Sequence, residues 1–440
     1  MISIFICIFI FILGYIKPKT TGWILLSLSP LLIGINNLIF YTDILFPLRW
    51  EQILFAGSIG IIFSKKYFSR IKSIILNNWP IFILVIYLLL SIVYGIIDPH
   101  ITLLKWFLLQ EYPSYFAIVV LCFALIRSYD DLLKFKKVIL LSTLIIVVLI
   151  FIELITKFNL PNYLCFFNIQ FCDESSLHFN LINSDYVFGI QEPSIRRYAG
   201  YTGDPNLTAI TLSMFMIFII HSLYVRKNHT LEFIFLVVCI GVLFIGQTRA
   251  AIFSFLLVIS IYGIFKYKLL KYLLYIILIM LFSYIFIDSF SAYINTFMEN
   301  RLLNGQANID EQRLSGLIKS LEVIKESFGL GVGGTIFSVS EKYLDYDDTT
   351  GYILHFLVGG IPFLLVYISL LLSMIYDLIK SKQNINIMTE HRLLINMSIL
   401  GLLIGMITQV FNENSIMFYY LLLYSAAKSS LFDKKISNRF

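Results

Sequence analysis

Long apolar runs fill most of the chain from Met1 to Phe440 and are interrupted by only two long polar stretches. Several runs have the roughly 20-residue length that crosses a bilayer, among them Trp79–Ile97, Val138–Ile155 and Lys271–Ile287. Lipid offers no partner to backbone N–H and C=O groups, so such runs are predicted to be helices. We therefore expect an all-α polytopic membrane protein of about 12–13 transmembrane helices.

The composition excludes an ordinary soluble domain, because 59% of the residues are hydrophobic and only 14% are charged, against about 25% charged in soluble proteins. The first run, Met1–Ile16, lacks a basic n-region and an A-x-A cleavage site, which favours a retained span over a signal peptide. No internal repeat is visible, so residues 1–440 are predicted to form one integral membrane domain.

The net charge of +6 could suggest a nucleic-acid partner, but the distribution of the charge argues against one. Basic residues fall in alternate connections between runs: Lys17 and Lys19; Lys65, Lys66, Arg70 and Lys72; Arg127, Lys134, Lys136 and Lys137; Arg226 and Lys227; Lys266, Lys268 and Lys271; Lys380, Lys382 and Arg392; and the tail residues Lys434, Lys435 and Arg439. This positive-inside pattern predicts a cytoplasmic C-terminus. The N-terminus then lies outside with 13 spans, or inside with 12. In either case the two polar stretches, residues 157–205 and 288–350, form outer loops.

The first outer loop ends in a predicted helix start, with Asp204 as N-cap and Pro205 in the first turn. Shortly before it, Arg196 and Arg197 could bind an anion or simply snorkel at the membrane interface. Gly200 and Gly203, which flank Tyr201 and Thr202, indicate a close backbone bend.

Arg249 stands between two apolar runs on the outer side, where the positive-inside rule disfavours it. Thr248 can cap the helix that follows, which puts Arg249 in the first turn. Amide donors, the positive helix end and a guanidinium together favour a bound phosphate or carboxylate. The alternative is an ion pair with a loop acid such as Glu192 or Asp204.

The second outer loop predicts an amphipathic helix over 314–328, because apolar residues recur there at helical spacing. Asp310 can cap this helix, with Arg313 in its first turn, and glycines from Gly329 onward end it. An acidic cluster that includes Asp347 and Asp348 follows. It fits either a general base or a solvated loop.

His355 lies one turn into the next span, which begins at Tyr352. It is either a substrate contact or a satisfied structural histidine. No cluster of His, Cys and carboxylate residues has metal-ligand spacing, so we expect neither a metal site nor another cofactor.

Four segments, taken in their order along the chain, resemble those of a known family. They are the stretch Arg197–Asn206 that enters a span, the junction Thr248-Arg249-Ala250, the Arg313 helix that ends in Gly329-Leu330-Gly331-Val332-Gly333, and the span entry Thr350-Gly351-Tyr352 that runs into Gly359-Gly360-Ile361-Pro362. Together they resemble the O-antigen polymerase and ligase superfamily of bacterial inner membranes. The resemblance covers residues 190–370, and its specificity lies in the order of the segments.

This resemblance implies a helical bundle in the inner membrane whose periplasmic loops form the site. The implied reaction is metal-independent glycosyl transfer between undecaprenyl-pyrophosphate-linked oligosaccharides, which serve as donor and acceptor. A chain-length regulator protein is a further partner to expect. The ligase branch carries a His-Asn pair before the tyrosine that matches Tyr352. Here Thr349-Thr350 fills that place, which favours the polymerase branch.

The resemblance also suggests roles for individual residues. Arginines at helix starts can hold the pyrophosphate charge in place of a metal ion, and acids can position or deprotonate the acceptor hydroxyl. The expected catalytic residues are Arg249, Arg313, Asp347, Asp348 and Glu192, and the expected substrate-binding residues are Arg196, Arg197, Tyr201, Asn206, Tyr352 and His355.

Two alternatives stay open. One is an O-antigen ligase that transfers polysaccharide to lipid A-core. The other is a lipid-linked oligosaccharide flippase or other transporter, which predicts ionisable residues within the spans, where Glu153 is among the few acids. Separately, an oxidising periplasm permits a disulfide between Cys165 and Cys172.

Overall fold

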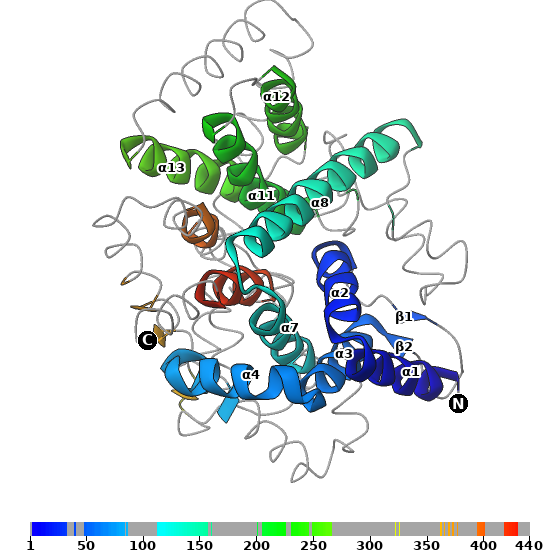
Figure 1. The fold of residues 1–440 in the computed structure, drawn as a ribbon. Helices are drawn as coiled ribbons and strands as arrows, with labels where there is room; N and C mark the ends of the chain where they lie inside the picture. Colours follow the sequence, from blue (N-terminus) through cyan, green and yellow to red (C-terminus); the bar gives the residue numbers. More distant parts are fainter. Residues whose placement is uncertain are drawn as a thin grey trace, which may run out of the picture.

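The computed structural model describes residues 2–32, 39–40, 48–83, 85–86, 112–156, 160, 200, 205–225, 230–245, 249–265, 322, 325, 361–362, 365, 368–369, 372–373, 376, 394–400 and 418–429. Nearly all of these residues are helical (Figure 1). The helices are α1 (Ile2–Ile16), α2 (Pro18–Leu32), α3 (Trp50–Phe63), α4 (Lys65–Asn77), α7 (Tyr112–Leu125), α8 (Tyr129–Thr156), α11 (Pro205–Val225), α12 (Thr230–Ile245) and α13 (Arg249–Phe265), and residues 394–400 and 418–429 are also helical. A small antiparallel ladder of β1 (Ile39–Phe40) and β2 (Leu48–Arg49) is the one departure from the all-α expectation in this part of the chain.

The helices form a bundle in which α7 and α8 separate two groups. Figure 1 shows α1, α2 and α3 on one side of α7 and α8 and α11, α12 and α13 on the other. Residues 207–223 of α11 are all buried, as are residues 117–126 at the end of α7 and 418–427. These three segments form the centre of the core.

Helix α8 is apolar on both faces. Phe135, Ile139 and Ile146 are buried against the bundle, whereas Leu141, Leu144, Val148 and Ile155 are exposed, Ile155 by 82%. Among the described helices, α8 is the one long and apolar enough to cross a membrane. Helices α1, α3, α7, α11, α12 and α13 have shorter apolar segments of 10–17 residues, such as Leu207–Leu223. The number of spans stays a prediction.

Helices α1 and α3 approach each other backbone to backbone at three glycines. A Cβ atom added to Gly14 would lie 2.5 Å from the carbonyl oxygen of Gly57, and one added to Gly60 would collide with the carbonyl oxygen of Phe11. Small residues permit this close approach, which increases van der Waals contact between helices. The glycines therefore fix the crossing of α1 over α3.

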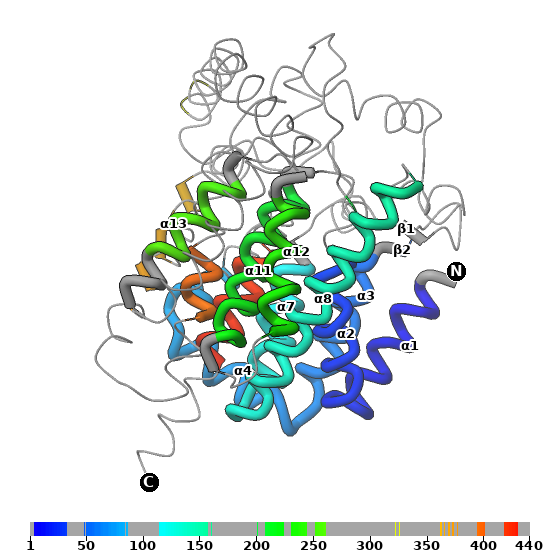
Figure 2. The backbone as a smooth tube through the Cα atoms, turned by 90° about the horizontal axis from the view of Figure 1, so that it is seen from above, coloured from blue at the N-terminus to red at the C-terminus, as the bar shows by residue number. Residues whose placement is uncertain are grey.

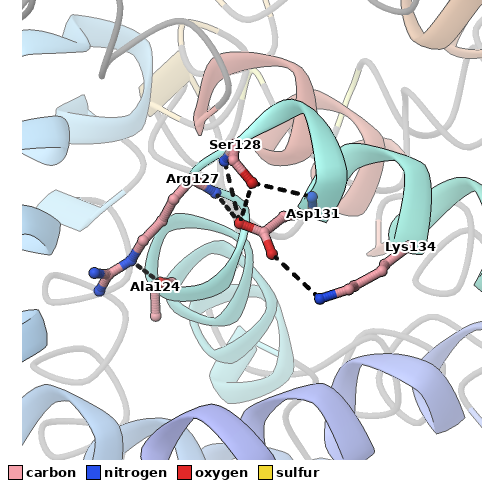
Figure 3. A network of polar contacts seen from close by, with 5 residues as sticks. All are labelled: Ala124, Arg127, Ser128, Asp131 and Lys134. Carbon is pink, nitrogen blue, oxygen red and sulfur yellow. Dashed lines mark hydrogen bonds and ion pairs between the residues drawn. The ribbon is translucent and has the colours of Figure 1, made fainter.

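Helix α8 begins at Tyr129, earlier than the apolar run Val138–Ile155 indicated. Figure 3 shows the reason. The side-chain oxygen Oδ2 of Asp131 accepts hydrogen bonds from the backbone N–H groups of Arg127 (3.2 Å) and Ser128 (3.1 Å), and Ser128 Oγ accepts one from Asp131 N–H (3.2 Å). This is a capping box. The sequence pattern places Lys134, Lys136 and Lys137 in a connection between apolar runs, but in the structure they belong to the first turns of α8.

Residues 65–72, whose basic side chains the sequence places in a connection between apolar runs, are also helical. They belong to α4, an amphipathic helix whose Tyr67, Ile71 and Ile74 are buried while Lys65, Lys66 and Lys72 are exposed. Lysines interrupt the apolar run, but the buried residues recur four and three positions apart, which is a helical period.

Arg70 ties α4 to the end of α7. Its Nε donates to the carbonyl oxygen of Phe123 (2.8 Å) and its guanidinium also donates to that of Ile126 (3.2 Å). The guanidinium of Arg127 lies 4.4 Å from the ring centre of Tyr67, a cation–π contact. We call the end of the bundle that carries Arg70, Arg127 and Lys134 the basic end.

The helical segment 418–429 runs parallel to α7. Its Ser429 donates to the carbonyl oxygen of Ile126 (2.6 Å) at the basic end, and the Sγ of Cys122 lies 3.6 Å from the carbonyl oxygen of Leu422. At its other end, Tyr419 donates to the carbonyl oxygen of Pro30 (2.6 Å), near the end of α2. The last described segment therefore joins α2 and α7 to the core.

Candidate functional site

The carboxyl end of α8 contacts Gly200, which follows Arg196 and Arg197 closely in the sequence. Helix α8 starts beside Arg127 at the basic end, and its 28 residues span about 42 Å, so its last turn lies at the opposite end of the bundle (Figure 2). There the buried carboxylate of Glu153 accepts a hydrogen bond from the backbone N–H of Gly200. The carbonyl oxygen of Gly200 accepts a second from the N–H of Leu160 (2.8 Å). We call this opposite end the Gly200 end.

Gly200 has a φ of +64°, a left-handed conformation that residues with a Cβ adopt at a cost. A Cβ at this position would lie 2.5 Å from Cγ1 of Ile150 on α8. Two independent features therefore require glycine at position 200: its backbone angle and its close contact with α8. The close bend predicted from the two glycines at 200 and 203 is confirmed at Gly200.

Helix α11 begins at Pro205, as the sequence predicted. Pro205 lies five residues after Gly200, and α11 packs against α8. The first turn of α11 therefore lies at the Gly200 end, and the helix runs back toward the basic end. A helix start presents unpaired N–H groups and a partial positive charge, which favour an anion.

Helix α13 begins at Arg249, so the prediction that this arginine occupies a first turn is confirmed. Four residues separate α11 from α12 and three separate α12 from α13. Such short connections join helices that run in opposite directions, and α11 packs against both α12 and α13 (Figure 2). The starts of α11 and α13 therefore face the same end of the bundle, the end that carries Gly200.

Most of the predicted site residues lie outside the described residues. These are Glu192, Arg196, Arg197, Tyr201, Arg313, Asp347, Asp348, Tyr352 and His355, and the side chains of Asn206 and Arg249 share this status although their backbones are described. Three other predictions fall on residues that the structure does not describe. They concern the caps Asp204 and Thr248, the helix over 314–328 apart from residues 322 and 325, and the pair Cys165 and Cys172.

Among the residues that are described, no group of three or more His, Cys, Asp or Glu side chains could hold a metal ion. Cys122 and Cys239 are buried in α7 and α12, and Cys7 is half-buried in α1; all three are free thiols. These three cysteines lie within helices, where they act as small apolar residues.

Residues 234–356 match the family model described as O-antigen ligase. This match confirms the resemblance to the O-antigen ligase and polymerase superfamily. It takes in Arg249, Arg313 and the acidic cluster with Tyr352 and His355, and it leaves out residues 192–206. No curated protein and no solved structure matches the chain.

The similarity to this superfamily has general implications for the chain. Members are glycosyltransferase-like enzymes of lipopolysaccharide and polysaccharide biosynthesis, and they are associated with bacterial membranes. The family match does not distinguish a polymerase from a ligase.

Glu153 is the residue of this region to which sequence reasoning gave no role. Its one signal in the sequence is chemical, because it is the one acid of α8 beyond the first turn, in an apolar stretch where ionisable groups are costly and tend to be functional. Its partner Gly200 is 47 residues away in the sequence, and no local pattern predicts such a contact.

Proposed function

We propose that the chain is a polymerase of O-antigen or a related surface polysaccharide. It joins undecaprenyl-pyrophosphate-linked oligosaccharide units by glycosyl transfer in which pyrophosphate-linked lipid is the leaving group. The observation that carries the proposal is that two helix starts, Pro205 of α11 and Arg249 of α13, face the Gly200 end of the bundle.

The chemistry of the leaving group supports this proposal. Charge builds up on the pyrophosphate as the glycosidic bond breaks, and fixed donors aimed at that charge lower the barrier. Helix N-termini and a guanidinium supply such donors without a metal ion. In the proposed site Arg197, Arg249 and Arg313 hold the pyrophosphate, and Asp347, Asp348 or Glu192 positions or deprotonates the acceptor hydroxyl.

We further propose that the bundle spans the bacterial inner membrane, with the basic end in the cytoplasm and the Gly200 end in the periplasm. Exposed apolar faces on α1 and α8 support this, since Phe5, Phe9, Leu141 and Ile155 would otherwise contact water. The lysines of α4 and α8 gather at the opposite end from Gly200, which is the charge asymmetry of the positive-inside rule.

A ligase is the second candidate, and one observation favours it: the matching family model bears the description O-antigen ligase. Against it stands Thr349-Thr350, which occupies the place of the His-Asn pair in the ligase branch.

The lipopolysaccharide pattern of a strain that lacks the gene separates these functions. Loss of a polymerase leaves a single repeat unit on the lipid A-core. Loss of a ligase leaves none, and lipid-linked polymer accumulates in the periplasm. Loss of a flippase also leaves none, without that accumulation. We expect the single-unit pattern, and either of the other two would exclude the polymerase.

A further inference from the structure

Glu153 makes a contact that its position in α8 alone would not require. It is the one acid of α8 beyond the first turn, and it is only 2% exposed. A carboxylate that leaves water loses its hydration, and this cost is offset only where other groups donate hydrogen bonds to it. The backbone N–H of Gly200 is such a donor.

The Gly200 turn is held from three directions. Its N–H donates to Glu153, its carbonyl oxygen accepts from Leu160 N–H, and its Cα lies so close to Ile150 that no Cβ fits. Both backbone polar groups of Gly200 are therefore paired, and Glu153 of α8 provides the side-chain acceptor.

We infer that Glu153 is a positioning residue for the pyrophosphate site, an inference that rests on the proposed function. Arg197 precedes Gly200 by three residues in the sequence. Pro205, the start of α11, follows Gly200 by five residues. Glu153 thus fixes Gly200, which lies between Arg197 and the start of α11 in the sequence. In the proposed site Arg197 and that helix start bind the anion together.

The geometry assigns Glu153 to positioning and not to proton transfer. A general base must reach the hydroxyl that it deprotonates, and a side chain 2% exposed that already accepts a backbone N–H does not reach a sugar in the periplasm. Charge on residue 153 matters less than an acceptor atom there. Gln, whose amide oxygen accepts the same hydrogen bond, should replace Glu153, whereas Leu should not.

Two measurements on the full-length protein in lipid nanodiscs test the inference. The first is hydrogen exchange of the Gly200 amide. In Glu153→Leu we expect it to accelerate by about tenfold or more, the effect of leaving one buried N–H group without its acceptor, and in Glu153→Gln by less than about threefold. The second is the affinity for undecaprenyl pyrophosphate, which should fall by about tenfold in Glu153→Leu and stay near that of the wild type in Glu153→Gln.

Two further variants provide a control and an independent test. Thr143→Val removes a buried hydroxyl of α8 that bonds only within the helix, to the carbonyl oxygen of Ile139 (2.8 Å), and should change neither measurement. Gly200→Ala should weaken pyrophosphate binding as Glu153→Leu does. Adding Ile150→Ala, which makes room for the new methyl group, should restore part of the affinity.

Three results would overturn the inference. They are unchanged exchange at Gly200 in Glu153→Leu, wild-type affinity despite faster exchange, and a Glu153→Gln variant that binds normally but transfers no sugar, which would make Glu153 a base. The failure of the proposed function is a different result. The wild type would then bind undecaprenyl pyrophosphate without making polymer, and the exchange and affinity data would still decide the role of Glu153.

Discussion

At the scale of single residues, the proposed chemistry depends on guanidinium groups at helix starts. Arg249 heads α13, where its charge adds to the positive end of the helix dipole. A guanidinium presents two parallel N–H groups to phosphate oxygens, whereas an ammonium presents a single point charge. Substitution of arginine by lysine therefore distinguishes two roles. It should impair anion binding, but it should preserve membrane anchoring, because lysine and arginine snorkel equally well.

Substitution of these arginines should therefore stop polymerisation without removing the protein. We expect Arg249→Ala and Arg313→Ala to abolish long-chain polymer at unchanged membrane abundance, and the lysine variants to recover only part of the chain length. Arg197→Ala should resemble them more than Arg196→Ala, since Arg197 matches the family pattern. Polymer length on gels and protein amount on blots are measured together.

Lys72→Ala serves as the control for lost charge, because this exposed lysine lies on α4 at the basic end. It should leave polymer length as in the wild type. Full-length polymer in Arg249→Ala and Arg313→Ala would exclude the proposed pyrophosphate site. Reduced abundance restored by lysine would indicate anchoring instead.

At the scale of helices, the crossing of α1 and α3 is predicted to be intolerant of a single methyl group. Gly60→Ala brings a Cβ into the carbonyl oxygen of Phe11, and such overpacking costs about 1–3 kcal/mol. Gly241→Ala on α12 is the matched control, because a Cβ there meets nothing within 4 Å. That variant should gain up to about 1 kcal/mol of helix propensity. Thermal unfolding of the purified proteins should shift in opposite directions, and equal shifts would exclude the close crossing.

The start of α8 offers a second test at this scale. Removing the carboxylate in Asp131→Ala leaves the N–H groups of Arg127 and Ser128 without the cap, a loss of about 1 kcal/mol. Asp130→Ala removes a neighbouring, exposed carboxylate for which no cap contact is described and should cost less. Unfolding temperatures measured side by side decide this. A larger loss in Asp130→Ala would contradict the capping box.

The local features of these helices could be predicted from the sequence, and the long-range ones could not. Pro205 and Arg249 begin α11 and α13 as expected because helix starts depend on neighbouring residues. Helix α4 was missed because lysines hid the apolar spacing of Tyr67, Ile71 and Ile74. The contact between Glu153 and Gly200 joins residues 47 positions apart, and only the packing of α8 beside the loop that leads into α11 brings them together.

At the scale of the whole molecule, the two ends of the bundle differ in charge and in chemistry. Arg70, Arg127 and Lys134 lie at the end of the bundle where α8 begins, and Glu153 and Gly200 lie near the last turn of α8. The whole of α8, with 28 residues, is about 42 Å long, which exceeds the roughly 30 Å of a hydrocarbon core. Both ends can therefore reach water on opposite sides of one membrane.

This arrangement predicts the topology of the chain in the membrane. Fusions of a reporter after Asn78 and Ser128, which lie between helices at the basic end, should be cytoplasmic. Fusions near Ser184 and Asn308 should be periplasmic, because each large loop follows a span that leaves the basic side. A reporter that is active only outside the cytoplasm distinguishes the two sets. If either large loop proved cytoplasmic, the proposed polymerase would be wrong, since its lipid-linked substrates are joined in the periplasm and Arg249 and Arg313 could not meet them there.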